Sequence, residues 1–193
     1  MSFKELVKKV EASKEFKTFK KENPKSVLYS AFFLMRQAAG NLILENQQLD
    51  FWLGNASKSG DFGHAKNKDV FEQEDVASFA FDGEKIQIKK DQLEPAHDKK
   101  DRSFRELDKN ISIDTEDVKK IILKELEKNN FEVKDVSKII LVLQEKEKTQ
   151  VWNITCIISL SMLRIHIDMK GKVLECKKSS LFDMMRVEKG KKK

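Results

Sequence analysis

The sequence predicts an α+β fold made of two tandem repeats, each with one helix packed on an antiparallel β-meander. Two observations carry this prediction. Segments with the hydrophobic period of a helix are followed by segments with the period-two alternation of half-buried strands, and this order occurs twice. In addition, a short hairpin motif at residues 79–87 has a counterpart at residues 165–173.

The C-terminal half contains a hairpin candidate at residues 162–177. From Leu163 to Asp168, apolar residues alternate with polar ones, which is typical of a strand with one buried face. Gly171 can supply the positive φ that the following turn requires. His166 occupies a polar position of the alternation, so we expect it to face solvent or a neighbouring helix.

Two further strands, 138–144 and 151–160, precede this hairpin and complete a four-stranded antiparallel meander. A helix comes before them, because the apolar residues between Val118 and Leu126 have helical spacing. We expect Asp114 or Thr115 to cap this helix and Asn129–Asn130 to end it.

The N-terminal half begins with a helix candidate at residues 3–22. Its apolar residues change face near Ser13, which predicts a bend, a restart with Ser13 as the N-cap, or a helix that is covered on both sides. Asn23–Pro24 ends the helix, since the residue before a proline avoids the α region. Strands rich in aromatic and branched residues follow at 26–35 and 42–53.

Residues 54–69 are rich in glycine and polar side chains and are expected to form an inserted loop. A short strand at 70–76 comes next, and then the strands 78–81 and 85–90, which are joined at Asp82–Gly83, a strong hairpin signal. The predicted organisation is a first repeat at 1–92, a linker at 93–113, a second repeat at 114–187 with a short last helix at 180–187, and a basic tail at 188–193.

The two hairpin motifs share one pattern, in which alternating apolar residues lead to an Asp, a turn with a Gly, a lysine and a branched apolar residue. The first instance ends in Asp82, Gly83 and Ile86, and Trp52 lies in a strand before it as Trp152 does in the second half. Because the order of elements also repeats, the sequence predicts an internal duplication.

Residues 114–178 resemble a PepSY-like domain, a small cystatin-like α+β module in which one helix crosses an antiparallel sheet. The first half matches this family more loosely. The resemblance implies an accessory, binding or inhibitory module, and members of the family are often joined to peptidases outside the cytoplasm. It is carried by Trp152 in its strand and by the hairpin Ile165-x-Ile167-Asp168-x-x-Gly171-x-Val173.

The net charge of +6 is concentrated at the C-terminus, because residues 177–193 hold seven basic and two acidic side chains. Lysine supplies most of the positive charge, whereas specific phosphate and base recognition relies largely on arginine, so a solvated surface is favoured. The sequence contains no run of about 18 apolar residues, so it predicts no membrane-spanning helix. Residues 1–16 lack the apolar core of a secretory signal, so we expect a cytoplasmic protein.

No arrangement of residues predicts catalysis, a cofactor or a metal site. His64 and His97 each have an Asp nearby, but no third ligand stands at a useful spacing. The triplet at 61–63 matches the magnesium-binding triplet of kinases without the glycine loop that would accompany it. Cys156 and Cys176 fall within strand patterns and are expected to be buried free thiols.

These observations lead to the hypothesis of a non-enzymatic, intracellular protein-binding or scaffolding module, whose partner is another protein or a second copy of the chain. The alternatives are weak association with RNA or the ribosome, and a peptidase inhibitor or propeptide-like module. For RNA, aromatic side chains could form a stacking platform, although core packing is the other interpretation of Phe32, Phe33, Phe51 and Trp52. The candidate partner-binding residues are Trp52, Trp152, Lys189, Lys191, Lys192 and Lys193.

Overall fold

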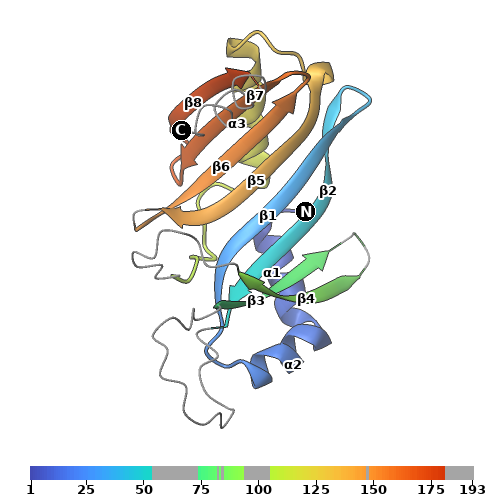
Figure 1. The fold of residues 1–193 in the computed structure, drawn as a ribbon, viewed down its shortest axis with the longest axis vertical. Helices are drawn as coiled ribbons and strands as arrows, with labels where there is room; N and C mark the ends of the chain where they lie inside the picture. Colours follow the sequence, from blue (N-terminus) through green and yellow to red (C-terminus); the bar gives the residue numbers. More distant parts are fainter. Residues whose placement is uncertain (54–73, 82, 84, 94–104, 147, 181–193) are drawn as a thin grey trace, which may run out of the picture.

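The computed structural model describes residues 1–53, 74–81, 83, 85–93, 105–146 and 148–180. In these residues the chain forms three α-helices, one short 3-10 helix and one eight-stranded antiparallel sheet (Figure 1). The predicted α+β class is therefore confirmed. The strands form one continuous sheet, however, where the sequence predicted two separate ones.

The two halves of the sheet meet at its centre. The strand order is β4-β3-β2-β1-β5-β6-β7-β8, so each half is a meander and the first strands of the two halves pair with each other. The helices are α1 (Phe3–Ala12), α2 (Lys14–Glu22) and α3 (Thr115–Lys128), with a 3-10 turn at Val133–Asp135. The strands are β1 (Val27–Ala38), β2 (Asn41–Trp52), β3 (Glu74–Phe81), β4 (Ile86–Leu93), β5 (Val136–Lys146), β6 (Thr149–Ile158), β7 (Ser161–Asp168) and β8 (Val173–Ser180).

Apolar side chains on both faces of β1 and β5 explain why these strands lie at the centre. On the face toward the helices, Phe33 pairs with Leu141, and both are completely buried. On the other face, Phe32 pairs with Val142. A strand that is apolar on both sides is typical of the interior of a sheet, because an edge strand would expose more of these side chains.

Of the alternatives for the first helix, the structure has the restart at Ser13. Ser13 follows the last residue of α1, and its Oγ accepts a hydrogen bond from the Phe16 amide at 3.1 Å, which caps α2. The apolar residues of both short helices point toward the sheet. The break at Ser13 changes the direction of the helix, so the apolar residues of α2 face the sheet as those of α1 do. Phe16 and Phe19 of α2 pack there against the rings of Phe51 and Phe79.

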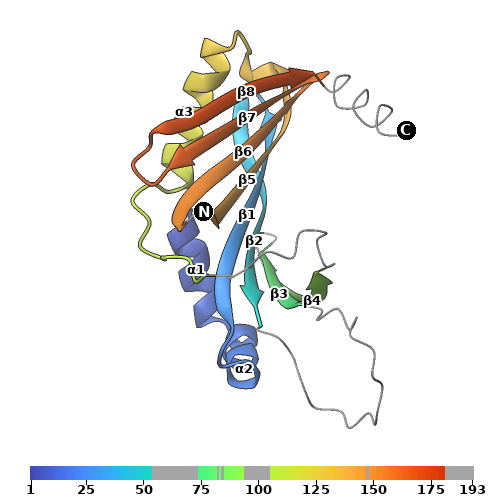
Figure 2. The same cartoon turned by 60° about the vertical axis from the view of Figure 1, so that its left-hand side comes forward.

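All three helices lie on one face of the sheet, and the core lies between them and the strands (Figures 1 and 2). The core is continuous across both halves. At its centre the Trp152 side chain is completely buried, with its ring 5.8 Å from the Phe33 ring. Its Nε1 donates a hydrogen bond to the Ile113 carbonyl oxygen at 3.1 Å.

Residues 105–113, which fall within the predicted linker 93–113, pack into this core. Leu107, Ile111 and Ile113 are buried, and the Leu107 amide donates a hydrogen bond to the Leu28 carbonyl oxygen at 2.7 Å. Residues 94–104 of the predicted linker lie outside the described residues. The described part of this segment therefore belongs to the core and crosses from one half of the sheet to the other.

Asp114 lies at the start of two helices. Its Oδ1 accepts hydrogen bonds from the amide of Thr115, the first residue of α3, at 2.7 Å, and from the amide of Phe3, the first residue of α1, at 2.6 Å. Its Oδ2 accepts from the Lys4 amide at 3.3 Å. The predicted cap of α3 is thus confirmed as Asp114, and the same carboxylate also satisfies amide groups of α1, whose own N-cap is Ser2.

The predicted β7–β8 hairpin is confirmed, and Asp168 organises its turn. The Asp168 Oδ1 accepts hydrogen bonds from the amides of Lys170 and Lys172, and Gly171 has φ +85°. A Cβ on Gly171 would lie 3.1 Å from the Ile113 side chain, so this position also needs a small residue.

Several predictions fall wholly or partly outside the described residues. These are the inserted loop 54–69, most of the short strand 70–76, Asp82 of the hairpin turn, and the last helix beyond Ser180. Ser180 itself ends β8 and does not begin a helix. In the described part of the chain, no helix has the length and the apolar character to span a membrane.

Candidate functional site

The face of the sheet that points away from the helices is the candidate functional surface. Because side chains alternate along a strand, every second residue of the eight strands lies on this face. The described helices cover the opposite face only (Figure 2). We call this surface the open face.

An apolar patch lies at the centre of the open face. It consists of Phe32 and Leu34 on β1 and of Ile140 and Val142 on β5, which are paired as Phe32 with Val142 and Leu34 with Ile140. All four side chains are partly exposed. These four contiguous side chains form a small apolar surface that another apolar group can cover.

Basic side chains form the rim of this apolar patch at one end, next to Leu34 and Ile140, and others lie farther out on the open face. Lys138 is the neighbour of Arg36 across the β1–β5 pair, and Arg164 is the neighbour of Lys177 across the β7–β8 pair. All four side chains are exposed. Arg36 forms an ion pair with Glu45 at 3.5 Å. Among the described residues, no acidic side chain forms an ion pair with Lys138, Arg164 or Lys177. At the rim itself, Lys138 therefore carries an uncompensated positive charge, whereas Arg164 and Lys177 lie two and three strands away from Ile140.

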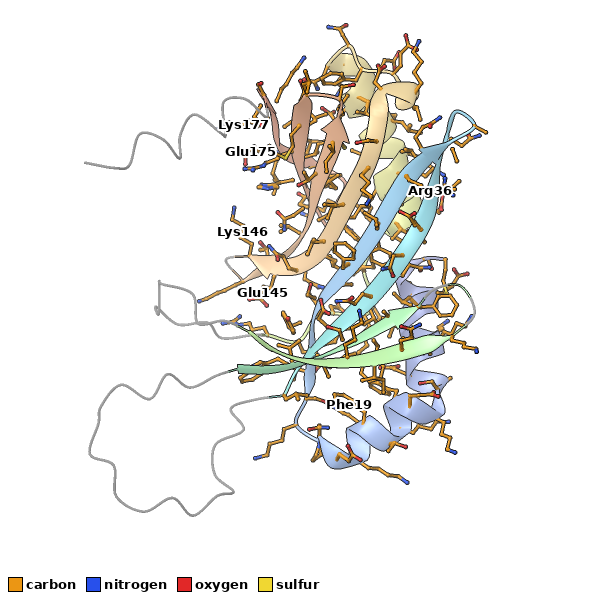
Figure 3. The ribbon with its side chains drawn as sticks, turned by 45° about the vertical axis from the view of Figure 1, so that its right-hand side comes forward. Phe19, Arg36, Glu145, Lys146, Glu175 and Lys177 are labelled. Atoms are coloured by element: carbon orange, nitrogen blue, oxygen red, sulfur yellow. The ribbon has the colours of Figure 1, made fainter. Side chains whose placement is uncertain are left out.

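A shallow pocket lies on the same face beside β8. The His166 Nδ1 lies 3.2 Å from the Glu175 Oε2, and both residues line this pocket. Figure 3 shows Glu175, Lys177 and Lys146 projecting from the same side of the sheet. His166 thus lies on the open face, as the alternation predicted. The pocket is lined by Lys146, Thr149, Val151, His166, Leu174 and Glu175.

On the described open face, the carboxylate of Asp50 in β2 accepts hydrogen bonds from side chains of β2 itself and of its two neighbours, β1 and β3. Its Oδ1 accepts hydrogen bonds from the Ser78 hydroxyl at 2.7 Å and from the Gln48 amide at 2.6 Å, and Ser30 contributes a third. Burial raises the pKa of the Asp50 carboxyl, and these three hydrogen bonds only partly offset the effect. The charged form of Asp50 therefore costs folding free energy at neutral pH.

We expect the substitution Asp50→Asn to increase the free energy of unfolding at pH 7. Asparagine keeps an acceptor for Ser78 but carries no charge to bury. Because the folded protein holds the proton of Asp50 more tightly than the unfolded chain, the wild type loses stability as pH rises above the ordinary range of an Asp.

The measurement is urea unfolding of both proteins between pH 3 and pH 7. The stability gain of the variant should shrink toward pH 3, and the substitution Asp117→Asn at an exposed position of α3 serves as the control. An Asp50→Asn protein that is less stable than the wild type at pH 7 would contradict this account.

The predicted partner-binding residues do not form one surface. Trp152 lies in the core, so no part of its ring can contact a partner in the folded protein. Trp52 ends β2 on the open face and is partly exposed. Lys189, Lys191, Lys192 and Lys193 lie outside the described residues.

The stacking platform considered for RNA is also divided between the two faces. Phe33 and Phe51 are buried against the helices, whereas Phe32 and Trp52 lie on the open face. A run of bases could not stack on all four rings, because the sheet backbone separates the two pairs.

The two cysteines differ in exposure. Cys156 is buried, as predicted, and burial raises the pKa of its thiol to about 12. Cys176 is exposed, so the prediction of a buried thiol is wrong at this position, because β8 is the edge strand of the sheet. Partial burial and the nearby Glu125 raise the pKa of the Cys176 thiol as well, which argues against a reactive thiolate.

No group of three or more potential ligands within the described ranges could hold a metal ion. His64 and His97, the loop histidines weighed as ligands, lie outside those ranges. The apolar patch was not recognised from the sequence, although residues 26–35 and 138–144 carry its signal, since both runs are apolar at odd and even positions.

No protein-family model and no curated protein matches the chain, so the resemblance to a PepSY-like domain stays a prediction. The crystal structure of a candidate lipoprotein from Clostridium difficile 630 is similar to this chain, with 14% sequence identity and a TM-score of 0.48. The similarity covers 86% of this chain and 90% of that one. By its own topology the chain is an α+β protein whose eight-stranded sheet has its described helices on one face only.

Proposed function

We propose that the protein is a non-enzymatic binding module that holds a segment of another protein on the open face of its sheet. The observation that carries this proposal is the apolar patch of Phe32, Leu34, Ile140 and Val142, which stays partly exposed at the middle of the sheet. Burying such a patch under a partner is favourable by about 25 cal/mol for each Å² removed from water.

The charge of the rim indicates the chemistry of the partner. Lys138 at the rim and Arg164, two strands away on the same face, are exposed and have no ion-pair partner among the described acidic side chains. A segment with apolar side chains flanked by Asp or Glu would match both the apolar patch and its rim, and such charge complementarity contributes specificity.

The test compares two substitutions that place a charge on opposite sides of the molecule, one on the open face of the sheet and one on the exposed side of α3. Ile140→Lys puts a charge into the apolar patch, whereas Leu123→Lys adds the same charge to an exposed apolar position on α3. The wild type and both variants, first shown to unfold with similar midpoints, are titrated with acidic amphipathic peptides and with proteins that cross-link to the wild type.

We expect binding to be lost with Ile140→Lys and kept with Leu123→Lys, and to weaken at high salt because part of it is electrostatic. Equal binding by the two variants, or no binding of any acidic apolar segment by the wild type, would refute the proposal.

We also propose that the two halves derive from a duplication of one helix-plus-meander unit, which is similar to a PepSY-like domain. What supports this is the order of elements, because in each half helical structure precedes four consecutive strands. Outward from the β1–β5 pair, the strands of each half follow in sequence order, β1 to β4 on one side and β5 to β8 on the other.

The other functions considered stay predictions. Association with RNA would rest on the basic tail and on fewer exposed aromatic rings than the sequence suggested. An inhibitory or propeptide-like role rests on the PepSY resemblance alone, and the cytoplasmic location rests on the composition of residues 1–16.

A further inference from the structure

No strand of the described residues pairs with the outer edge of β8. β8 pairs with β7 on one side and ends the strand order of the sheet on the other. The five consecutive residues 174–178 are all exposed. An edge strand presents a row of backbone donors and acceptors that a further strand can use.

The side chains of β8 divide between the two faces of the sheet. Glu175 and Lys177 pair with His166 and Arg164 of β7 and lie on the open face. Cys176 and Lys178 lie on the helix face, where the Lys178 Nζ is 4.2 Å from the centre of the Phe131 ring. Charges of opposite sign thus stand two residues apart on one face of an edge strand.

This spacing favours one register of self-pairing. Two copies of one strand can pair antiparallel about a two-fold axis so that equivalent side chains lie on the same face of the joined sheet. One residue then lies opposite its own copy, and the axis passes between these two residues. An axis at Glu175 would place the two Glu175 side chains opposite each other, and an axis at Lys177 would oppose the two lysines. An axis at Cys176 places Glu175 of each copy opposite Lys177 of the second copy.

We propose that β8 pairs antiparallel with β8 of a second copy of the chain, centred on Cys176, and that this pairing joins the two sheets into one. Each dimer then contains two Glu175–Lys177 pairs across the interface, and the open faces of both copies lie on the same side. The pairing involves only the short strand Val173–Ser180, so the dimer is weak, with a Kd on the order of micromolar or above.

The test uses charge reversals, with sedimentation of the full chain over a wide concentration range as the readout. Glu175→Lys and Lys177→Glu each turn both cross-strand pairs into like-charge pairs, so each should weaken self-association about tenfold or more. An equimolar mixture of the two variants should associate as well as the wild type, because one chain then presents two lysines at these positions and the other presents two glutamates.

Lys170→Glu, an equal charge change at an exposed turn position, is the control and should leave self-association unchanged. Cross-linking gives a second readout, since a short bismaleimide should join the two Cys176 thiols of a dimer, and Cys176→Ser should abolish the product. The buried Cys156 should not react in the folded protein.

A wild type that stays monomeric at all concentrations would overturn the proposal. So would two single variants that associate like the wild type, or a mixture that associates no better than either variant alone. Binding of an acidic partner at the open face is a separate measurement, so a failure of the dimer and a failure of the proposed function are distinguishable.

Discussion

Replacing Trp152 with alanine should lower the free energy of unfolding by about 3–5 kcal/mol, which is a large share of the stability of an ordinary domain. Trp152 is completely buried, and its ring lies between the strands and the segment that ends at Ile113. The substitution leaves a cavity beside Phe33 and removes the hydrogen-bond donor of the Ile113 carbonyl oxygen.

Denaturant unfolding measures this effect, with Trp52→Ala as the matched control. The control makes the same change at a partly exposed site, so its cost should be clearly smaller. If Trp152→Ala does not fold, Trp152→Phe keeps one aromatic ring and loses the hydrogen bond and part of the packing, at a cost of about 1–3 kcal/mol. Equal losses for Trp152→Ala and Trp52→Ala would contradict the burial of Trp152.

Replacing Asp114 with alanine should cost roughly 2 kcal/mol, because this carboxylate caps α3 and also accepts amide hydrogen bonds at the start of α1, and the loss of such bonds at one helix start costs about 1 kcal/mol. The amides of Phe3 and Thr115 would both lose their acceptor. Asp114→Asn keeps the acceptor oxygen for Phe3 and Thr115 but loses the bond from the Lys4 amide and the attraction between the charge and two helix dipoles, so it should cost less.

The diagnostic measurement for Asp114→Ala is amide hydrogen exchange in α1. Exchange should accelerate at Phe3 and Lys4, which lie far from residue 114 in the sequence, as well as at the start of α3. Asp117→Ala removes an exposed carboxylate from the first turn of α3 and should cost about 0.5 kcal/mol or less. Unchanged exchange in α1 would show that Asp114 does not cap this helix in solution.

The secondary structure was largely predictable because its signals are local. The restart at Ser13, the cap at Asp114 and the hairpin at Gly171 each depend on a few neighbouring residues. Periodicity showed which face of a strand is buried, but it could not show which strand lies beside it. The β1–β5 pair was therefore missed, and with it the single sheet.

The candidate site was harder to predict for the same reason. Phe32 and Val142 form part of one surface only because β1 and β5 are neighbours, and no local pattern indicates that pairing. Trp152 was correctly placed in a strand, but whether it faced the core or a partner depended on the position of residues 105–113. The exposure of Cys176 likewise follows from the place of β8 at the edge of the sheet.

The pairing of β1 with β5 also has a consequence for how the chain folds. Every other neighbouring pair of strands is joined in consecutive order, whereas Phe33 and Leu141 lie about a hundred residues apart. Bringing such distant segments together has a high entropic cost, and contacts of this kind slow folding. We therefore expect the hairpins of each half to form early, and the union of the two halves along β1 and β5 to limit the folding rate.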